Sequence, residues 1–239
     1  GKMGGRLQRL AGGGTHRMRM RSKPWAKPEL EACPFFLRHP EQQKGRWHEW
    51  FPEEGAIHLE LGCGKGYFIA GLAPLHPELH YIGIDLKDVI LAPAKRVIEA
   101  AFDGKPIHNV ALTGHDIERL REIMGEADQV ERIYINFCNP WPKPRHWKRR
   151  LTYPTRLEDY RMLLAPQGEI WFKTDDGPLY RDTLRYFEEA GYEVYWTTED
   201  LHADPCSDEI TVMTEHERMF SEQGIRIKAA KARVLPRKE

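Results

Sequence analysis

The sequence is poor in cysteine, in long apolar runs and in net charge. Its four cysteines lie far apart among 239 residues, so neither a disulfide framework nor a metal site is expected. No apolar run is long enough to span a bilayer, and the basic N-terminus lacks the apolar segment of a secretory signal. Equal numbers of acidic and basic residues exclude a globally basic nucleic-acid binder. We therefore expect a cytoplasmic protein with reduced thiols, no membrane segment and no metal.

A chain of this length can bury one α/β core, and it contains no internal repeat or dividing linker. Residues 1–17 are rich in glycine and lack periodicity, so we expect a disordered leader or an expression remnant there. The rest, residues 18–239, is predicted to be a single domain, as a monomer or homodimer. It begins with a basic arm, Met18–Lys27, which can contact phosphate.

The most informative local feature is the segment Ile57–Gly66, Ile-His-Leu-Glu-Leu-Gly-Cys-Gly-Lys-Gly. A short apolar strand leads to Glu60, glycine follows at Gly62, Gly64 and Gly66, and a helical pattern comes next. Glycines let a ligand approach the backbone, and the free N–H groups of a helix start face it. The spacing is similar to motif I of Rossmann-like methyltransferases that use S-adenosylmethionine (SAM).

Beyond this turn, strand and helix patterns alternate, which predicts crossover units and a mostly parallel sheet with helices on both faces. The predicted strands are Ala56–Leu61, His80–Ile84, Asn109–Thr113, Arg132–Phe137, Gly168–Lys173, Glu193–Thr197 and Ile225–Val234. The predicted helices are Gly66–Leu75, Val89–Phe102, Ile117–Met124, Thr155–Leu164, Leu179–Ala190 and Glu215–Ser221. The expected fold is α/β and Rossmann-like, with a seven-stranded sheet whose last strand is antiparallel.

Polar residues follow several of these strands, where ligands of open α/β sheets bind. Asp85 is placed to accept from the ribose hydroxyls of an adenosyl group, and Asp116 from an adenine amino group. Asn139 follows the fourth strand, and Asp175 follows the fifth. An acid after one strand is most often a helix cap, but acids after several strands predict a ligand site.

The stretch from Asn139 to Thr152 combines charge with aromatic rings. Three prolines stiffen it, and it contains His146, two tryptophans and the cations Lys143, Arg145, Lys148, Arg149 and Arg150. Interleaved cations and rings are suited to gripping a polyanion and stacking an unpaired base. We therefore predict contact with a nucleic acid.

Together the segments of the chain resemble the bacterial tRNA (guanine-N7-)-methyltransferases. The resemblance rests on Glu60–Gly66, Asn136–Lys143, Arg145-His146, Lys148–Leu151, Lys173–Asp175 and Thr214–Glu217. It implies a methyltransferase domain over residues 18–239, SAM as methyl donor and tRNA as partner. The implied acceptor is N7 of the guanosine at position 46, in the variable loop.

The resemblance also implies roles for particular residues. The glycine corner with Glu60, Asp85 and Asp116 is the expected cofactor site. The residues expected to bind the tRNA substrate are Lys143, Arg145, Asp175, Thr214 and Glu217. Asn139 and Asp175 are the expected catalytic residues. The sequence departs from the family pattern at three positions. It has Asp85 where many members have Glu, Asn139 where Asp is common, and His216 where an aromatic such as Tyr is usual.

Two alternative functions are also compatible with the sequence. Asn139-Pro-Trp141 resembles the (Asp/Asn)-Pro-Pro-aromatic motif of amino-methyltransferases that act on adenine or glutamine. The third residue is Trp141 rather than proline, and a basic stretch follows directly, which favours a tRNA substrate. The second alternative is a non-catalytic RNA-binding module that retains the glycine corner.

Overall fold

The computed structural model describes residues 21–206 and 208–237, so the leader and the first residues of the basic arm lie outside the described residues. The described chain contains one sheet of eight strands in the order β1-β4-β3-β2-β5-β6-β8-β7. Its strands are β1 (Phe36–Leu37), β2 (Ala56–Leu61), β3 (Leu79–Asp85), β4 (Val110–Gly114), β5 (Val130–Asn136), β6 (Leu164–Thr174), β7 (Tyr192–Thr198) and β8 (Lys228–Val234).

The pairing confirms a mostly parallel sheet with an antiparallel last strand. β8 runs antiparallel to both of its neighbours, β6 and β7. At the centre, Leu59 of β2 is in register with Ile82 of β3 and with Ile133 of β5, and all three are fully buried. The eighth strand, which the sequence did not predict, is the two-residue β1 that pairs with β4 at one edge.

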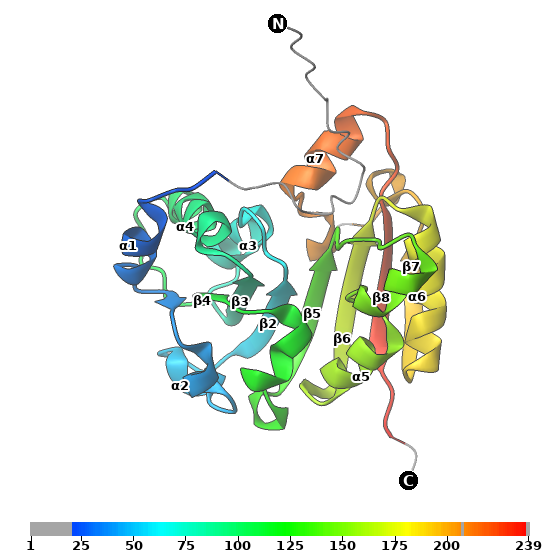
Figure 1. Cartoon of the computed structure of the whole chain (residues 1–239), viewed down its shortest axis with the longest axis horizontal. Coiled ribbons are helices and arrows are strands. Elements are labelled where there is room, and N and C mark those ends of the chain that lie inside the picture. Colours follow the sequence, from blue (N-terminus) through cyan, green and yellow to red (C-terminus); the bar gives the residue numbers. More distant parts are fainter. Residues whose placement is uncertain (1–20, 207, 238–239) are drawn as a thin grey trace, which may run out of the picture.

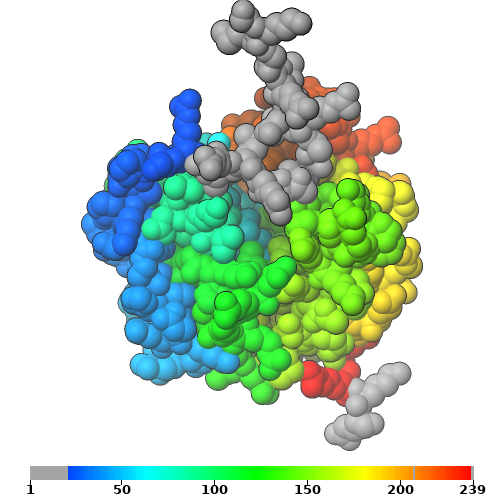
Figure 2. Space-filling view, in the orientation of Figure 1, coloured from blue at the N-terminus to red at the C-terminus, as the bar shows by residue number. Residues whose placement is uncertain are grey.

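Helices cover both faces of the sheet, as predicted (Figure 1). The helices of the described residues are α1 (Ala26–Glu31), α2 (Trp47–Trp50), α3 (Tyr67–Leu72), α4 (Asp88–Phe102), α5 (Pro154–Arg161), α6 (Gly177–Glu189) and α7 (Glu215–Glu222). One apolar core packs α5 and α6 against one face, and a second core packs α1, α3 and α4 against the other. The space-filling view shows the N-terminal segments in blue on one side and α6 in yellow on the other (Figure 2).

Three predicted helices differ from the structure. The helix predicted over Gly66–Leu75 ends at Leu72, where the 3₁₀ segment η2 (Ala73–Leu75) follows. Ile117–Met124 forms not an α-helix but the 3₁₀ segment η3 (Ile117–Glu122), because Arg119 has non-helical dihedral angles that interrupt the i to i+4 bonds. The helix predicted to reach Leu164 ends at Arg161, and Leu164 pairs with Val130 in the sheet. Sheet pairing therefore overrides the local helical pattern at that end.

The described part of the basic arm is folded against the domain. Lys23 donates to the carbonyl of Val89 at the start of α4, at 3.1 Å. The Arg96 guanidinium lies 3.8 Å from the centre of the Trp25 ring. The arm therefore brings a lysine to the same edge of the sheet as the glycine corner.

Candidate functional site

The glycine corner joins β2 to α3 at the carboxyl edge of the sheet. Gly66 caps α3 with φ of +79°, and a Cβ there would lie 3.0 Å from the carbonyl oxygen of Ala94. Gly64 also has positive φ, +53°, but a Cβ there would meet no atom within 4 Å. Gly66 therefore permits close packing against Ala94 of α4, whereas Gly64 leaves open space beside the backbone.

That open space belongs to a cavity of about 490 Å³. Its walls include Glu60, Gly62, Gly64 and Asp85, four of the six predicted cofactor residues. Phe137 follows β5 and also lines it. The cavity thus lies where the carboxyl ends of β2, β3 and β5 meet, the expected ligand position in an open α/β sheet.

Among the acids that line this cavity, Glu60 has the largest pKa shift. Its side chain is 3% exposed, and one oxygen accepts from the Asn136 amide at 2.9 Å. The other oxygen is buried without a hydrogen-bond partner. Burial raises the pKa of Glu60 to about 8, although Asn136 and Lys173 oppose the shift. A buried carboxylate oxygen without a donor fits the ammonium group of an amino-acid ligand such as the methionine part of SAM.

Asp85 fixes the shape of the glycine turn. One carboxylate oxygen accepts from the Gly64 N–H at 2.8 Å, and the other accepts from the Leu86 N–H at 2.7 Å. Burial raises the pKa of Asp85, and these two hydrogen bonds oppose the shift. Asp116 instead caps η3 by accepting from the Glu118 N–H at 2.9 Å. Its role with SAM stays a prediction.

The fourth wall of the cavity is α7, which lies above the carboxyl ends of the strands in Figure 1. Thr214, Glu215 and His216 line the cavity, and the Thr214 hydroxyl caps α7 by accepting from the Glu217 N–H at 3.1 Å. An ion pair between Lys65 and Glu215, at 2.9 Å, joins the glycine turn to the start of α7.

Glu217, predicted to bind substrate, is fully buried. It accepts from the Lys173 ammonium at 2.6 Å, and Lys173 also donates to the carbonyl of Val212 at 2.8 Å. His202 approaches the second carboxylate oxygen at 2.5 Å without the alignment of a hydrogen bond. The carboxylate is therefore positioned to hold α7. The sequence signal for this contact was Lys173 itself, a lysine at the end of an apolar strand.

The two predicted catalytic residues, Asn139 and Asp175, follow β5 and β6. Asn139 is half-buried, and its side-chain oxygen accepts from the Trp141 N–H at 3.0 Å. Asp175 is also half-buried; burial raises the pKa of its carboxyl group, while Lys228 and His216 are near enough to oppose the shift. The backbone carbonyl of Asp175 accepts from Lys228 at 3.2 Å.

The basic stretch forms the 3₁₀ segment η5 (Pro144–Arg149). Four of its predicted cations are exposed: Lys143, Arg145, Lys148 and Arg149. The fifth was predicted wrongly, because Arg150 is only 2% exposed and is bound inside the protein. Trp141 and His146 pack edge to face, with ring centres 5.5 Å apart. The loop thus presents cations beside rings on its outer surface.

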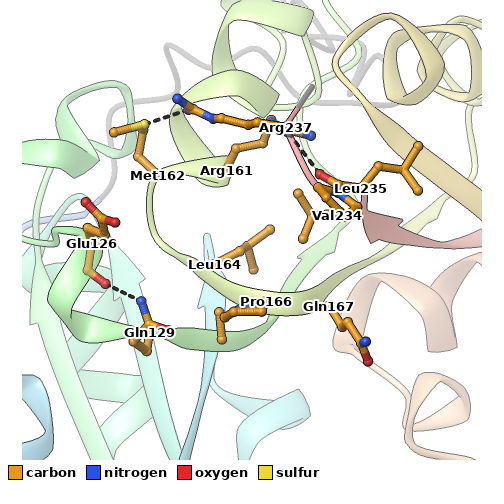
Figure 3. A pocket seen from close by; sticks show the side chains of 12 residues that line it. Glu126, Gln129, Arg161, Met162, Leu164, Pro166, Gln167, Val234, Leu235 and Arg237 are labelled. Carbon is orange, nitrogen blue, oxygen red and sulfur yellow. Dashed lines mark hydrogen bonds between the residues drawn. The ribbon is translucent and has the colours of Figure 1, made fainter. Parts of the chain in front are cut away.

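A second cavity, of about 570 Å³, lies at the opposite edge of the sheet (Figure 3). Residues before β5, at the start of β6 and after β8 line it, among them Gln129, Leu164 and Leu235. Arg161, a half-buried residue of its lining, already donates to the carbonyls of Ala190, Gly191 and Leu235. Because the predicted residues gather at the other edge, we assign the functional site there.

Comparison with known proteins identifies the family. A family model described as "Putative methyltransferase" matches residues 54–230. A tRNA (guanine-N(7)-)-methyltransferase of Clostridium beijerinckii is 53% identical over 213 residues, which cover 88% of this chain and 96% of that protein. One of Clostridium perfringens is 52% identical over 221 residues, covering 91% of this chain and all of that protein.

The chain belongs to the tRNA (guanine-N(7)-)-methyltransferase family. This confirms the family that the sequence motifs indicated, and the chain is an enzyme of the methyltransferase class. The two alternatives, an amino-methyltransferase and a non-catalytic RNA-binding module, are not favoured. Solved structures confirm the Rossmann-like fold: the 16S rRNA methyltransferase KamB has a TM-score of 0.56 at 14% identity, covering 83% of this chain and 92% of that one. An antibiotic-related methyltransferase has a TM-score of 0.53 at 15% identity, covering 93% and 96% of the two chains.

Two findings bear on other expectations. Within the residues that the structure describes, no helix has the length and apolar content to cross a membrane. In the same residues, no group of three or more His, Cys, Asp or Glu side chains could hold a metal ion.

Proposed function

We propose that this protein binds SAM in the 490 Å³ cavity and methylates N7 of a guanosine in tRNA. The observation that carries the proposal is the buried, unpartnered oxygen of Glu60, a residue that lines this cavity together with Gly64. Glu60 accepts from the ligand ammonium, and Asp85 both shapes the turn and faces the ribose. The finer proposal for the acceptor is the guanosine at position 46 of the variable loop, and the finer proposal for location is the cytoplasm.

The reaction needs little acid–base chemistry from the chain. When bound, SAM supplies a methyl group on a positively charged sulfur. The lone pair of guanine N7 forms the new bond to the methyl carbon as the carbon–sulfur bond breaks, S-adenosylhomocysteine leaves, and no proton moves. The chain must therefore align the reactants, a contribution of about 7–11 kcal/mol when alignment is complete.

The acceptor-side residues supply that alignment in our proposal. The half-buried Asn139 and Asp175 follow adjacent strands, β5 and β6, and a base held between them lies near the cavity. The purine gains positive charge as the methyl arrives, so the Asn139 oxygen and the Asp175 carboxylate stabilise it electrostatically. The exposed cations Lys143 and Arg145 bind the tRNA backbone.

Nucleoside analysis of a tRNA transcript after incubation with SAM and the protein tests this proposal. We expect 7-methylguanosine as the product. A matched transcript with 7-deazaguanosine at position 46 lacks the nucleophilic nitrogen and should gain no methyl group. Methylation of that transcript would contradict the assigned position, and methyladenosine as the product would favour the amino-methyltransferase alternative.

A further inference from the structure

Arg150 ends the basic run in the sequence but lies inside the protein. Its side chain is 2% exposed, whereas Lys148 and Arg149 beside it are exposed. A guanidinium this deeply buried cannot reach a phosphate without leaving its partners. The sequence pattern alone assigns all three cations to the nucleic acid, so Arg150 needs another role.

The partners of Arg150 lie on two separate segments, the loop after β5 and helix α6. Its Nε donates to the carbonyl of Pro140 at 2.8 Å. Its Nη1 donates to Asp182 at 2.7 Å and to the Tyr186 hydroxyl at 3.0 Å, both on α6. Hydrogen bonds from Arg150 and Arg185 hold the pKa of Asp182 below its usual range, although burial of the carboxyl group acts to raise it. Arg150 therefore connects the loop after β5 to the helix that begins just beyond Asp175.

The Pro140–Trp141 peptide is held from both ends. Its carbonyl accepts from Arg150, and its N–H donates to the Asn139 side chain at 3.0 Å. Trp141 has φ of +41°, a left-handed conformation that costs about 1–3 kcal/mol in a residue other than glycine unless its surroundings fix it. Asn139 and Arg150 thus fix one strained peptide unit together.

We propose that Arg150 is a positioning residue that acts through this peptide to orient Asn139 toward the acceptor base. The inference rests on the proposed function, because it assigns Asn139 to the acceptor. Arginine is suited to the task, since its planar guanidinium reaches the Pro140 carbonyl and the Asp182 carboxylate at once. A lysine ammonium is a single point and cannot span both.

The same substitution at a buried and at an exposed arginine provides the test. Arg150→Lys should lower the single-turnover methylation rate at saturating tRNA by about tenfold to a hundredfold, the cost of a misplaced group. Arg46→Lys is the matched control and should leave the rate within about twofold, because Arg46 is exposed before α2, outside the basic stretch. SAM affinity, tRNA affinity and its salt dependence should be unchanged in Arg150→Lys.

A double-mutant cycle separates positioning from general structural support. In an Asn139→Ala background, Arg150→Lys should change the rate by less than about twofold, because the residue through which it acts is gone. Asp182→Asn leaves the basic run untouched and should lower the rate in the same way, which keeps the test valid if Arg150→Lys folds poorly. Additive effects in the cycle, or unchanged rates in both variants, would overturn the proposal.

The outcomes also distinguish this inference from the proposed function. If the parent protein forms no 7-methylguanosine in tRNA, the proposed function fails. If the parent is active and Arg150→Lys instead weakens tRNA binding and lowers its salt dependence, Arg150 contacts phosphate and only the positioning role fails.

Discussion

The ammonium of Lys173 lies 2.6 Å from a carboxylate oxygen of Glu217, and both side chains are fully buried. The Lys173 ammonium also lies 4.9 Å from the centre of the Phe68 ring of α3. Burial lowers the pKa of Lys173, and the Glu217 carboxylate opposes the shift. This pair attaches α7 to the end of β6, so the α7 wall of the 490 Å³ cavity depends on a charge pair in the core.

Breaking this pair from one side should be costly. Glu217→Gln or Lys173→Met leaves one buried charge without its counterion, and we expect a loss of about 3–5 kcal/mol in the free energy of unfolding. Urea denaturation measures this loss. The double variant Lys173→Met with Glu217→Met should be more stable than the worse single variant. Equal destabilisation by Glu217→Gln and by the exposed control Glu222→Gln would contradict the role of the pair.

The raised pKa of Glu60 predicts pH-dependent binding of SAM. Below a pH of about 8 the free protein holds a proton on this carboxyl group, and the ligand ammonium favours the ionised form. SAM affinity should therefore rise as the pH increases toward 8, with release of a proton. Calorimetric titration in buffers of different ionisation enthalpy measures that proton. Glu60→Gln should bind more weakly and lose the pH dependence.

The same group gives an opposite prediction for stability. The pKa of Glu60 in the folded state is raised from 4.5, so the unfolded chain releases a proton that the folded chain retains. The stability of the ligand-free protein due to this group should fall as the pH rises from about 4.5 to 8. Glu60→Gln lacks this pH-dependent contribution to stability. Its melting temperature relative to the parent should increase over that range, and a constant difference would contradict the assignment.

Asn139 tests the electrostatics of methyl transfer. Asn139→Asp keeps the oxygen that accepts from the Trp141 N–H and adds negative charge where positive charge develops, so turnover should be equal or higher. Asn139→Ala should lose about a hundredfold, or some 2.7 kcal/mol. Single-turnover methylation of one transcript compares the three proteins. SAM affinity should change little, and parental turnover in Asn139→Ala would limit the residue to a turn-forming role.

The exposed cations of the basic stretch Asn139–Thr152 should determine the salt dependence of tRNA binding. Removal of Lys143 and Lys148 together should reduce the log–log slope by about 1.4–1.8, at about 0.7–0.9 per phosphate contact. Filter binding across a salt series measures the slope. Lys105→Ala is the control, since Lys105 is exposed beyond the far end of α4. A slope unchanged from that of the parent would show that the two lysines are merely solvated.

Local sequence patterns were sufficient to predict the central fold. β2 has the predicted bounds, Ala56–Leu61, and α7 differs from its prediction by one residue at its end. Strand and helix periodicity, and the glycines that take positive φ, are properties of neighbouring residues. The order in which polar residues follow strands likewise predicted that Glu60 and Asp85 would meet, because parallel strands end at one edge.

Tertiary packing decided what the charged residues do. Lys148 and Arg150 look equivalent in the sequence. In the fold, Arg150 contacts Asp182 and Tyr186 of α6, whereas Lys148 is exposed to solvent. Glu217 follows the cavity residue Thr214 by three positions, yet it faces Lys173 from a strand 44 residues earlier in the chain. Burial depends on which distant segment covers a residue, and sequence spacing carries no record of that. The sequence therefore determined the fold and the edge at which the predicted residues gather, and only the tertiary structure separated the exposed cations from the buried charges that join distant segments.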